Sequence, residues 1–160
     1  MSDARIPSLG PRGEGWVGAQ IAVGAAIVAL GIVGSDWPSG ARFTCAVLGI
    51  ALAVGGLALA VWGMVALGPS LTPFPRPSEG ATFRGDGAYR LVRHPIYGGL
   101  VLLATGWSLV RSPLALAATG LLVVVFELKS RHEESMLVAT YPEYAAYQER
   151  VRWRFVPGLR

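Results

Sequence analysis

Cationic and aromatic side chains gather in one short stretch of this sequence, from Gly87 to Gly99, which reads GAYRLVRHPIYGG. Arg90, Arg93 and His94 can donate hydrogen bonds to a carboxylate or a phosphate, and backbone N–H groups beside the glycines can do the same. The stretch follows a loop rich in glycine and proline and runs into an apolar segment. This junction between a loop and an apolar helix is therefore the first candidate for a functional site.

A second candidate group lies nearer the C-terminus, where Glu133 and Glu134 follow each other in a charged, helix-forming segment. Carboxylates can bind an ammonium group or another organic cation. Neighbouring positions on an α-helix point about 100° apart, so at most one of the pair can face a ligand fully. We expect that residue to be Glu134, because it shares a helical face with Leu137 and Tyr141.

Each candidate also has a purely structural interpretation. Arg90 and Arg93 could anchor a helix end at the membrane interface, and His94 could simply cap the helix that follows it. The two glutamates could belong to a solvated helix face with i, i+4 ion pairs. Glu127, at the end of an apolar run, indicates either a functional role or an ion-pair partner, because a charge at membrane depth is costly.

The composition indicates a membrane protein. Hydrophobic residues make up 52% of the 160 residues and charged residues 15%, with a mean hydropathy of +0.48. This chain is too apolar for an ordinary soluble domain, and its length suits a single domain over residues 1–160. The net charge of +4 does not indicate nucleic-acid binding, because the arginines flank apolar runs and no recognition motif is present. With Cys45 as the one cysteine, we expect no disulfide and no metal site.

Four apolar runs predict an all-α, polytopic fold with about four transmembrane helices. The expected helices cover residues 15–35, 43–67, 94–110 and 112–128. Ser112 and Pro113 suit an N-cap and a first helical turn, so the last two helices should form a tight hairpin. Both of these helices are short for a hydrocarbon core of about 30 Å unless flanking residues extend them.

Small residues recur at four-residue spacing in the first two apolar runs and would allow close approach between helices. The pairs are Ala22 with Ala26, Gly49 with Ala53, and Gly56 with Ala60. A composition rich in alanine and glycine would also produce such pairs by chance.

The charged tail over residues 129–154 is expected to be helical and to lie outside the membrane. Thr140 and Glu143 have capping-box spacing, which predicts a new helix that runs through YAAYQERVRWR. The long segment 68–95 lacks apolar periodicity. Its prolines favour a stiff extended stretch, TPFPRP, and we expect an ordered cap over the membrane face rather than a disordered loop.

The basic residues predict the orientation. If the N-terminus, the long loop and the tail share one side, that side holds every Lys and Arg except Arg42 and Arg111. The positive-inside rule then places these three segments in the cytoplasm. We therefore expect both termini to be cytoplasmic, and a site between loop and tail to open toward the cytosol and the inner leaflet.

The order of these segments resembles that of a known family. TPFPRP, GAYRLVRHPIYGG, an apolar hairpin and RHEESMLVATYPEYAAYQERVRWRFVP follow each other as in the isoprenylcysteine carboxyl methyltransferase family and its phospholipid methyltransferase relatives. These are small integral-membrane enzymes that use S-adenosylmethionine. The resemblance runs from the proline-rich loop to Pro157, while the first two helices match only in being apolar. Tyr141 and Pro142 replace a frequent Phe-Gly, and RWRFVP departs from the usual closing Pro-Arg-hydrophobic-Pro.

The resemblance implies a cofactor site made of the Arg-His-Pro and Glu-Glu motifs. The residues expected to bind S-adenosylmethionine are Gly87, Tyr89, Arg93, His94, Pro95, Tyr97, Glu133 and Glu134, with 68–95 as the cofactor loop. Among them His94, Arg93 and Glu134 are the expected catalytic residues. Tyr144, Tyr147 and Arg131 are the expected substrate contacts.

The implied reaction is methyl transfer to a lipophilic acceptor, an isoprenylcysteine-type carboxylate or a lipid, at the cytoplasmic face of a cell or inner membrane. A carboxylate acceptor is ionised near neutral pH, whereas an amine acceptor must first lose a proton, for which His94 or a glutamate is the candidate base. No G-x-G-x-x-G motif follows a predicted strand, which argues against a Rossmann-type methyltransferase.

Two alternatives stay open. One is an NADPH-dependent membrane reductase of sterol-like lipids, a group similar to this family around the Arg-His motif. The short chain and the Glu-Glu tail count against it. The other is a non-catalytic membrane scaffold whose long loop binds a partner protein.

Overall fold

The computed structural model describes residues 7–75 and 82–158, and within these ranges it contains five α-helices, two short 3-10 helices and no strand. The α-helices are α1 (Glu14–Val33), α2 (Ser39–Leu67), α3 (Pro95–Arg111), α4 (Pro113–Thr140) and α5 (Tyr144–Arg150), and the 3-10 helices are η1 (Gly68–Ser70) and η2 (Gly87–Arg90). The predicted all-α class is therefore confirmed. The first six residues of the predicted domain and the Arg-Pro end of the predicted TPFPRP stretch lie outside the described residues.

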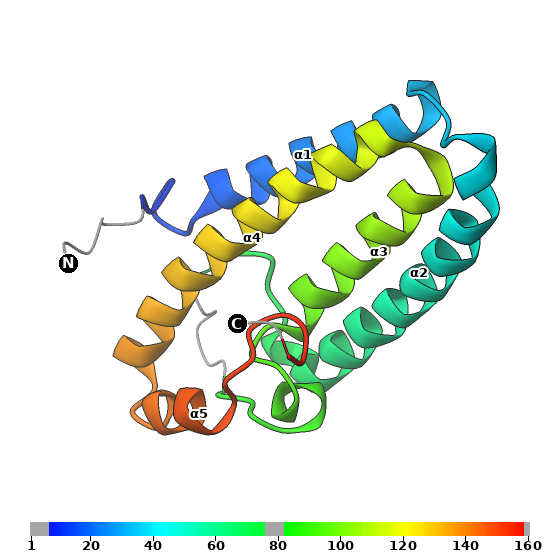
Figure 1. The fold of residues 1–160 in the computed structure, drawn as a ribbon. Coiled ribbons are helices and arrows are strands. Elements are labelled where there is room, and N and C mark those ends of the chain that lie inside the picture. The colour runs from blue at the N-terminus through cyan, green and yellow to red at the C-terminus, as the bar shows by residue number, and fades with distance from the viewer. Residues whose placement is uncertain (1–6, 76–81, 159–160) are drawn as a thin grey trace.

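The four long helices lie side by side, with α3 between α2 and α4, and with α1 packed mainly against α4 (Figure 1). The chain enters α3 and leaves α4 at the same end of the bundle, where α2 also ends. Figure 1 shows α5 and the long connections gathered at this end. The prediction that the loop and the tail meet is therefore confirmed.

Three helices are long and apolar enough to cross a membrane: α1, α2 with its η1 extension, and α4. The predicted fourth span, α3, has 17 residues, or about 26 Å at 1.5 Å per residue, and its crossing remains a prediction. The predicted span 112–128 and the first part of the predicted tail helices from 129 onward form one helix, α4, which continues without a break to Thr140. This extension contains good helix formers and neither glycine nor proline.

The contact between α2 and α3 depends on glycines. A Cβ atom added at Gly56 would lie 2.6 Å from the carbonyl oxygen of Gly99, and one added at Gly49 would lie 2.6 Å from that of Gly106. Side chains at these positions would push the two helices apart, so small residues hold them at close distance. The small-residue prediction is thus confirmed for α2, whereas Ala22 and Ala26 of α1 are exposed.

The junction between α3 and α4 confirms the predicted tight hairpin. One residue, Ser112, separates the helices, and its Oγ accepts a hydrogen bond from the backbone N–H of Leu114 at 3.2 Å. The predicted capping box at the next junction was wrong. Thr140 donates its hydroxyl to the carbonyl of Met136 instead, and the side chain of Glu143 makes no cap hydrogen bond.

The segment after α5 is extended rather than helical, which corrects the prediction of a helix through residue 154. The backbone N–H of Arg93 donates to the carbonyl of Trp153 at 2.9 Å, and that of His94 donates to Arg154 at 2.8 Å. In this extended segment the carbonyls of Trp153 and Arg154 accept from Arg93 and His94 rather than from N–H groups of a continued helix. At Gly98 the backbone of Phe155 comes so close that no Cβ atom would fit. The tail therefore packs directly on the start of α3.

Candidate functional site

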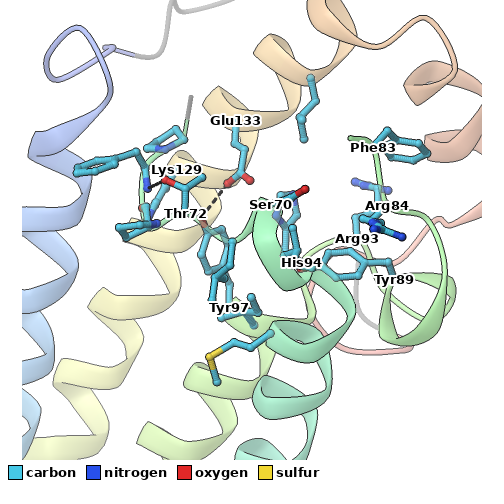
Figure 2. A pocket seen from close by; sticks show the side chains of 18 of the residues that line it. Ser70, Thr72, Phe83, Arg84, Tyr89, Arg93, His94, Tyr97, Lys129 and Glu133 are labelled. Atoms are coloured by element: carbon cyan, nitrogen blue, oxygen red, sulfur yellow. Dashed lines mark hydrogen bonds between the residues drawn. The ribbon is translucent and has the colours of Figure 1, made fainter. Parts of the chain in front are cut away.

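A cavity of about 330 Å³ lies at this end of the molecule. Its walls come from α2, α3, α4 and α5, with one residue of α1, and from the loop segments on both sides of residues 76–81. The described parts of the expected cofactor loop therefore cover the cavity as an ordered cap. Figure 2 shows 18 of the lining side chains.

Polar and aromatic side chains gather at two sides of this cavity (Figure 2). The group that we call the lysine end consists of Gln20, Thr72, Tyr97, Lys129 and Glu133. The group that we call the arginine end consists of Phe83, Tyr89, Arg93, Tyr144 and Tyr147. His94 lies between the two ends in Figure 2. The Arg-His and Glu-Glu motifs, far apart in the sequence, thus contribute to one cavity.

Glu134 is 6% exposed and does not line the cavity. Its Oε1 accepts hydrogen bonds from Nε of Arg93 at 2.8 Å and from Nε2 of His94 at 3.0 Å. Nη2 of Arg154 and Nε2 of Gln148 donate to the other oxygen at 3.3 and 3.2 Å. We call these five residues the Glu134 cluster. Both carboxylate oxygens are fully engaged, so Glu134 serves to position Arg93 and His94.

Glu127 extends this cluster. Its carboxylate accepts from Nε of Arg131 at 2.7 Å and from Nη1 of Arg154, so the ion-pair interpretation of Glu127 is confirmed. Burial alone would lower the pKa of Arg154, but its hydrogen bond to Glu127 and the nearby charge of Glu134 raise it. Arg154 therefore remains cationic and ties the extended tail to α4.

The ring of His94 is held in a defined orientation. It stacks on Tyr97 with ring centroids 5.3 Å apart, and Tyr97 stacks on Phe126 at 4.7 Å. Because Nε2 faces the carboxylate of Glu134, we assign the proton to that nitrogen. Nδ1 is then the ring nitrogen left to accept a proton or a hydrogen bond.

Glu133, rather than Glu134, lines the cavity, against the expectation from the sequence. Its Oε2 accepts a hydrogen bond from the hydroxyl of Tyr97 at 2.7 Å. The cavity face of α4 carries Lys129, Glu133 and Leu137, which are spaced four residues apart. Of the two neighbouring glutamates, Glu133 is the one that a ligand in the cavity can contact.

Aromatic rings form the wall of the arginine end. Phe83 packs edge-on against Tyr144 and Tyr147, with centroids 5.7 and 5.1 Å apart, and Tyr147 donates its hydroxyl to the carbonyl of Tyr89 at 2.7 Å. The hydroxyl of Tyr144 is buried without a hydrogen-bond partner among the described residues. Burial raises the pKa of Tyr144 and Tyr147, so both hydroxyls remain protonated donors.

Three residues expected at the site lie elsewhere. Arg131 is exposed and pairs with Glu127. Gly87 has a positive φ of 54° and shapes the η2 turn, whereas Pro95 begins α3. None of the three lines the cavity.

Gln20, Thr72 and Lys129 are among the cavity residues to which the sequence analysis gave no individual role. A signal was available for Lys129, the one lysine of the chain, which precedes Glu133 by one helical turn. No group of three or more His, Cys, Asp or Glu residues that could hold a metal ion occurs within residues 7–75 and 82–158. The cavity therefore offers cationic donors, one carboxylate, an aromatic wall and one unpaired hydroxyl.

Comparison with known proteins identifies a family. The family model described as Phospholipid methyltransferase matches residues 44–144, from α2 to the first residue of α5. The matched segment contains Arg93, His94, Glu133 and Glu134. No curated protein sequence matches the chain.

Proposed function

Because this chain belongs to the phospholipid methyltransferase family, we propose that it transfers a methyl group from S-adenosylmethionine to a lipophilic acceptor held in the membrane. The acceptor is a membrane lipid or an isoprenylcysteine-type carboxylate. The observation that carries this proposal is the single cavity in which Arg93 and His94 meet Glu133 beside an aromatic wall.

The chemistry of these residues fits the cofactor. Arg93 uses Nε and Nη1 for contacts within the protein, which leaves Nη2 to bind the carboxylate of S-adenosylmethionine. Glu133 can bind its ammonium group. The adenine needs an apolar slot and a hydrogen-bond partner, and the rings of Phe83 and Tyr147 with the unpaired hydroxyl of Tyr144 supply both. The orphaned hydroxyl supports a ligand here, because a buried donor without a partner is costly.

S-adenosylmethionine supplies an electrophilic methyl group: the acceptor's lone pair forms the new bond to the methyl carbon while the methyl–sulfur bond breaks and leaves its electron pair on sulfur. The chain's own contribution depends on the acceptor. An amine acceptor must lose a proton, which Nδ1 of His94 accepts while Glu134 stabilises the resulting imidazolium through Nε2. A carboxylate acceptor needs no base, and positioning and water exclusion then provide the catalysis.

Apolar side chains favour an acceptor that reaches the cavity from the membrane. Met64, Leu67, Ile96 and Leu100, from α2 and α3, line it together with the polar groups. Along α3, Leu100 lies about one turn beyond Tyr97, toward the apolar part of the bundle. An acyl or prenyl chain can occupy this region while its headgroup reaches His94.

We further propose that the whole chain, residues 1–160, is one integral-membrane domain of the cell or inner membrane with the site and both termini on the cytoplasmic side. Arg42 at the start of α2 and Arg111 at the end of α3 lie at the end of the bundle opposite the cavity. The other basic residues within the described ranges 7–75 and 82–158 fall on the cavity side, as the positive-inside rule requires for a cytoplasmic site.

Binding of S-adenosylhomocysteine to detergent-purified full-length protein, measured by calorimetry, tests the cofactor assignment. We expect saturable binding that His94→Ala and Glu133→Gln each weaken roughly tenfold or more. Glu143→Gln removes the same charge from an exposed position and should bind like the wild type. NADPH serves as the control ligand. Preferential NADPH binding would point to a membrane reductase, and binding of neither ligand to folded protein would point to a scaffold; both results contradict the proposal.

A further inference from the structure

A buried cation at the lysine end is not explained by the cofactor contacts proposed above. Lys129 is 0% exposed although its side chain lines the cavity. Its Nζ donates to Oε1 of Gln20 at 2.6 Å and to the carbonyl of Pro73 at 2.9 Å, and it lies 4.9 Å from the ring centre of Tyr97. All of these partners are uncharged.

The charge of Lys129 lacks a direct counterion. Among the described residues, no carboxylate forms an ion pair with Lys129, and the nearby Glu133 instead accepts the hydroxyl of Tyr97. A buried ammonium group is costly unless it is paired. An ammonium also has three N–H donors, of which the contacts to Gln20 and Pro73 use two. The third donor and most of the positive charge are left for a ligand.

Two neighbours supply further donors. Gln20 accepts through Oε1, so its amide nitrogen can donate to a ligand. Thr72 accepts the backbone N–H of Phe74 at 3.2 Å, which leaves its hydroxyl hydrogen to donate. Figure 2 shows Thr72 beside Lys129 on the side of the cavity away from Arg93. Three donors from three separate segments therefore line the cavity at the lysine end.

We propose that Lys129, Gln20 and Thr72 form a subsite for an anionic oxygen group in the acceptor's headgroup, either a lipid phosphate or a carboxylate. This inference rests on the proposed function in treating the cavity's second ligand as the methyl acceptor. The anion neutralises the charge of Lys129 and accepts the unused donors. Tyr97, stacked on His94 at 5.3 Å, lies between this subsite and the proposed base, so a headgroup held here presents its reactive atom toward His94.

The contacts of Lys129 also join α1 and the loop to α4. If this structural role were its only one, a variant that keeps these contacts would bind anionic ligands like the wild type. Gln20→Glu separates the two roles. It preserves an oxygen that accepts from Nζ, so the link between the helices stays, while its negative charge repels an anionic ligand and pairs with Lys129. Lys129→Met is the second variant. Arg152→Met, which removes a cation from an exposed position, is the matched control.

The experiment measures binding of soluble acceptor probes to full-length protein in detergent by thermophoresis. Dihexanoyl phosphatidylethanolamine carries the phosphate and dihexanoylglycerol lacks it. N-acetyl-S-farnesylcysteine carries a carboxylate and its amide lacks it. S-adenosylhomocysteine binding to each variant is recorded in parallel as the readout for the cofactor site.

We expect Gln20→Glu to weaken binding of an anionic probe roughly tenfold or more, with uncharged probes, S-adenosylhomocysteine and the melting temperature unchanged. The probe affected identifies the phosphate or the carboxylate as the ligand. Unchanged binding of both anionic probes to Gln20→Glu would overturn the subsite, as would an equal loss of every ligand in Lys129→Met with no effect of Gln20→Glu. If wild-type protein binds no S-adenosylhomocysteine yet discriminates anionic probes through Lys129, the subsite stands and the methyl-transfer proposal fails.

Discussion

The Glu134 cluster and the lysine end lie against different faces of the C-terminal half of α4, and they differ in how their charges are paired. In the cluster, one carboxylate receives hydrogen bonds from Arg93, His94, Arg154 and Gln148. At the lysine end, Lys129 has only uncharged partners among the described residues. The cations of the cluster are paired with the carboxylate of Glu134, whereas the cation of the lysine end keeps unused bonding capacity beside a cavity.

This difference separates Glu134, which holds its neighbours in place and does not line the cavity, from Lys129 and Glu133, which line it. Buried charges that are paired with one another rigidify their surroundings. Removal of one of them should therefore lower the free energy of unfolding, and ligand binding is then lost as a consequence. A cavity group with spare donors should instead affect ligand affinity with little change in stability. The following predictions test this distinction.

The largest effect is expected for Glu134→Ala. It leaves the buried Arg93 without a carboxylate partner and Arg154 with Glu127 alone, which should lower the free energy of unfolding by about 3–5 kcal/mol. Denaturant titration in detergent, followed by circular dichroism, measures this loss, and S-adenosylhomocysteine binding should disappear with it. A stable Glu134→Ala protein that lost only cofactor binding would instead place Glu134 in direct contact with the cofactor.

A smaller loss of stability is expected for Arg154→Met, because Arg154 joins the extended tail to both Glu127 and Glu134. Removal of a charged hydrogen-bond donor should cost about 1.5–3 kcal/mol. Hydrogen exchange should show faster exchange at the amides of Arg93 and His94, which donate to the tail. The exposed Arg152→Met is the control, and equal exchange in both variants would show that the tail is held by other contacts.

Glu133→Gln should change affinity rather than stability. The amide can still accept the hydroxyl of Tyr97, so the free energy of unfolding should change by no more than about 1 kcal/mol. The lost charge should weaken S-adenosylhomocysteine binding roughly tenfold, as calorimetry would show against Glu143→Gln. A large loss of stability in Glu133→Gln would contradict the distinction between Glu134, which stabilises the fold, and Glu133, which binds a ligand.

The smallest effect is expected for Arg131→Ala. The side chain of Arg131 is 55% exposed and forms an i, i+4 pair with Glu127, and such surface pairs contribute about 0.3–0.5 kcal/mol. Thermal unfolding and binding of the acceptor probes should both remain close to wild type. A tenfold loss of probe binding would restore Arg131 as a substrate contact, as the sequence first indicated.

Much of the fold was predictable because its signals are local. Apolar runs predicted the long helices, and Ser112 with Pro113 predicted the hairpin, since capping depends on residues within one turn. The topology inferred from the basic residues predicted that the long loop and the tail would face each other, and the family resemblance implied that the Arg-His and Glu-Glu motifs share a site; Arg93, His94 and Glu133 do line one cavity. The capping box at Thr140 failed because its hydroxyl had a competing local partner, the carbonyl of Met136.

The sequence by itself thus determined an all-α membrane chain and which two motifs share a site. Only the tertiary structure decided what each residue does there. The rotation of α4 about its axis, set by packing such as that of Phe126 against Tyr97, turns Glu133 toward the cavity and Glu134 away from it. Lys129 meets Gln20 and Pro73 across large sequence separations, and helical periodicity alone contains no information about such contacts.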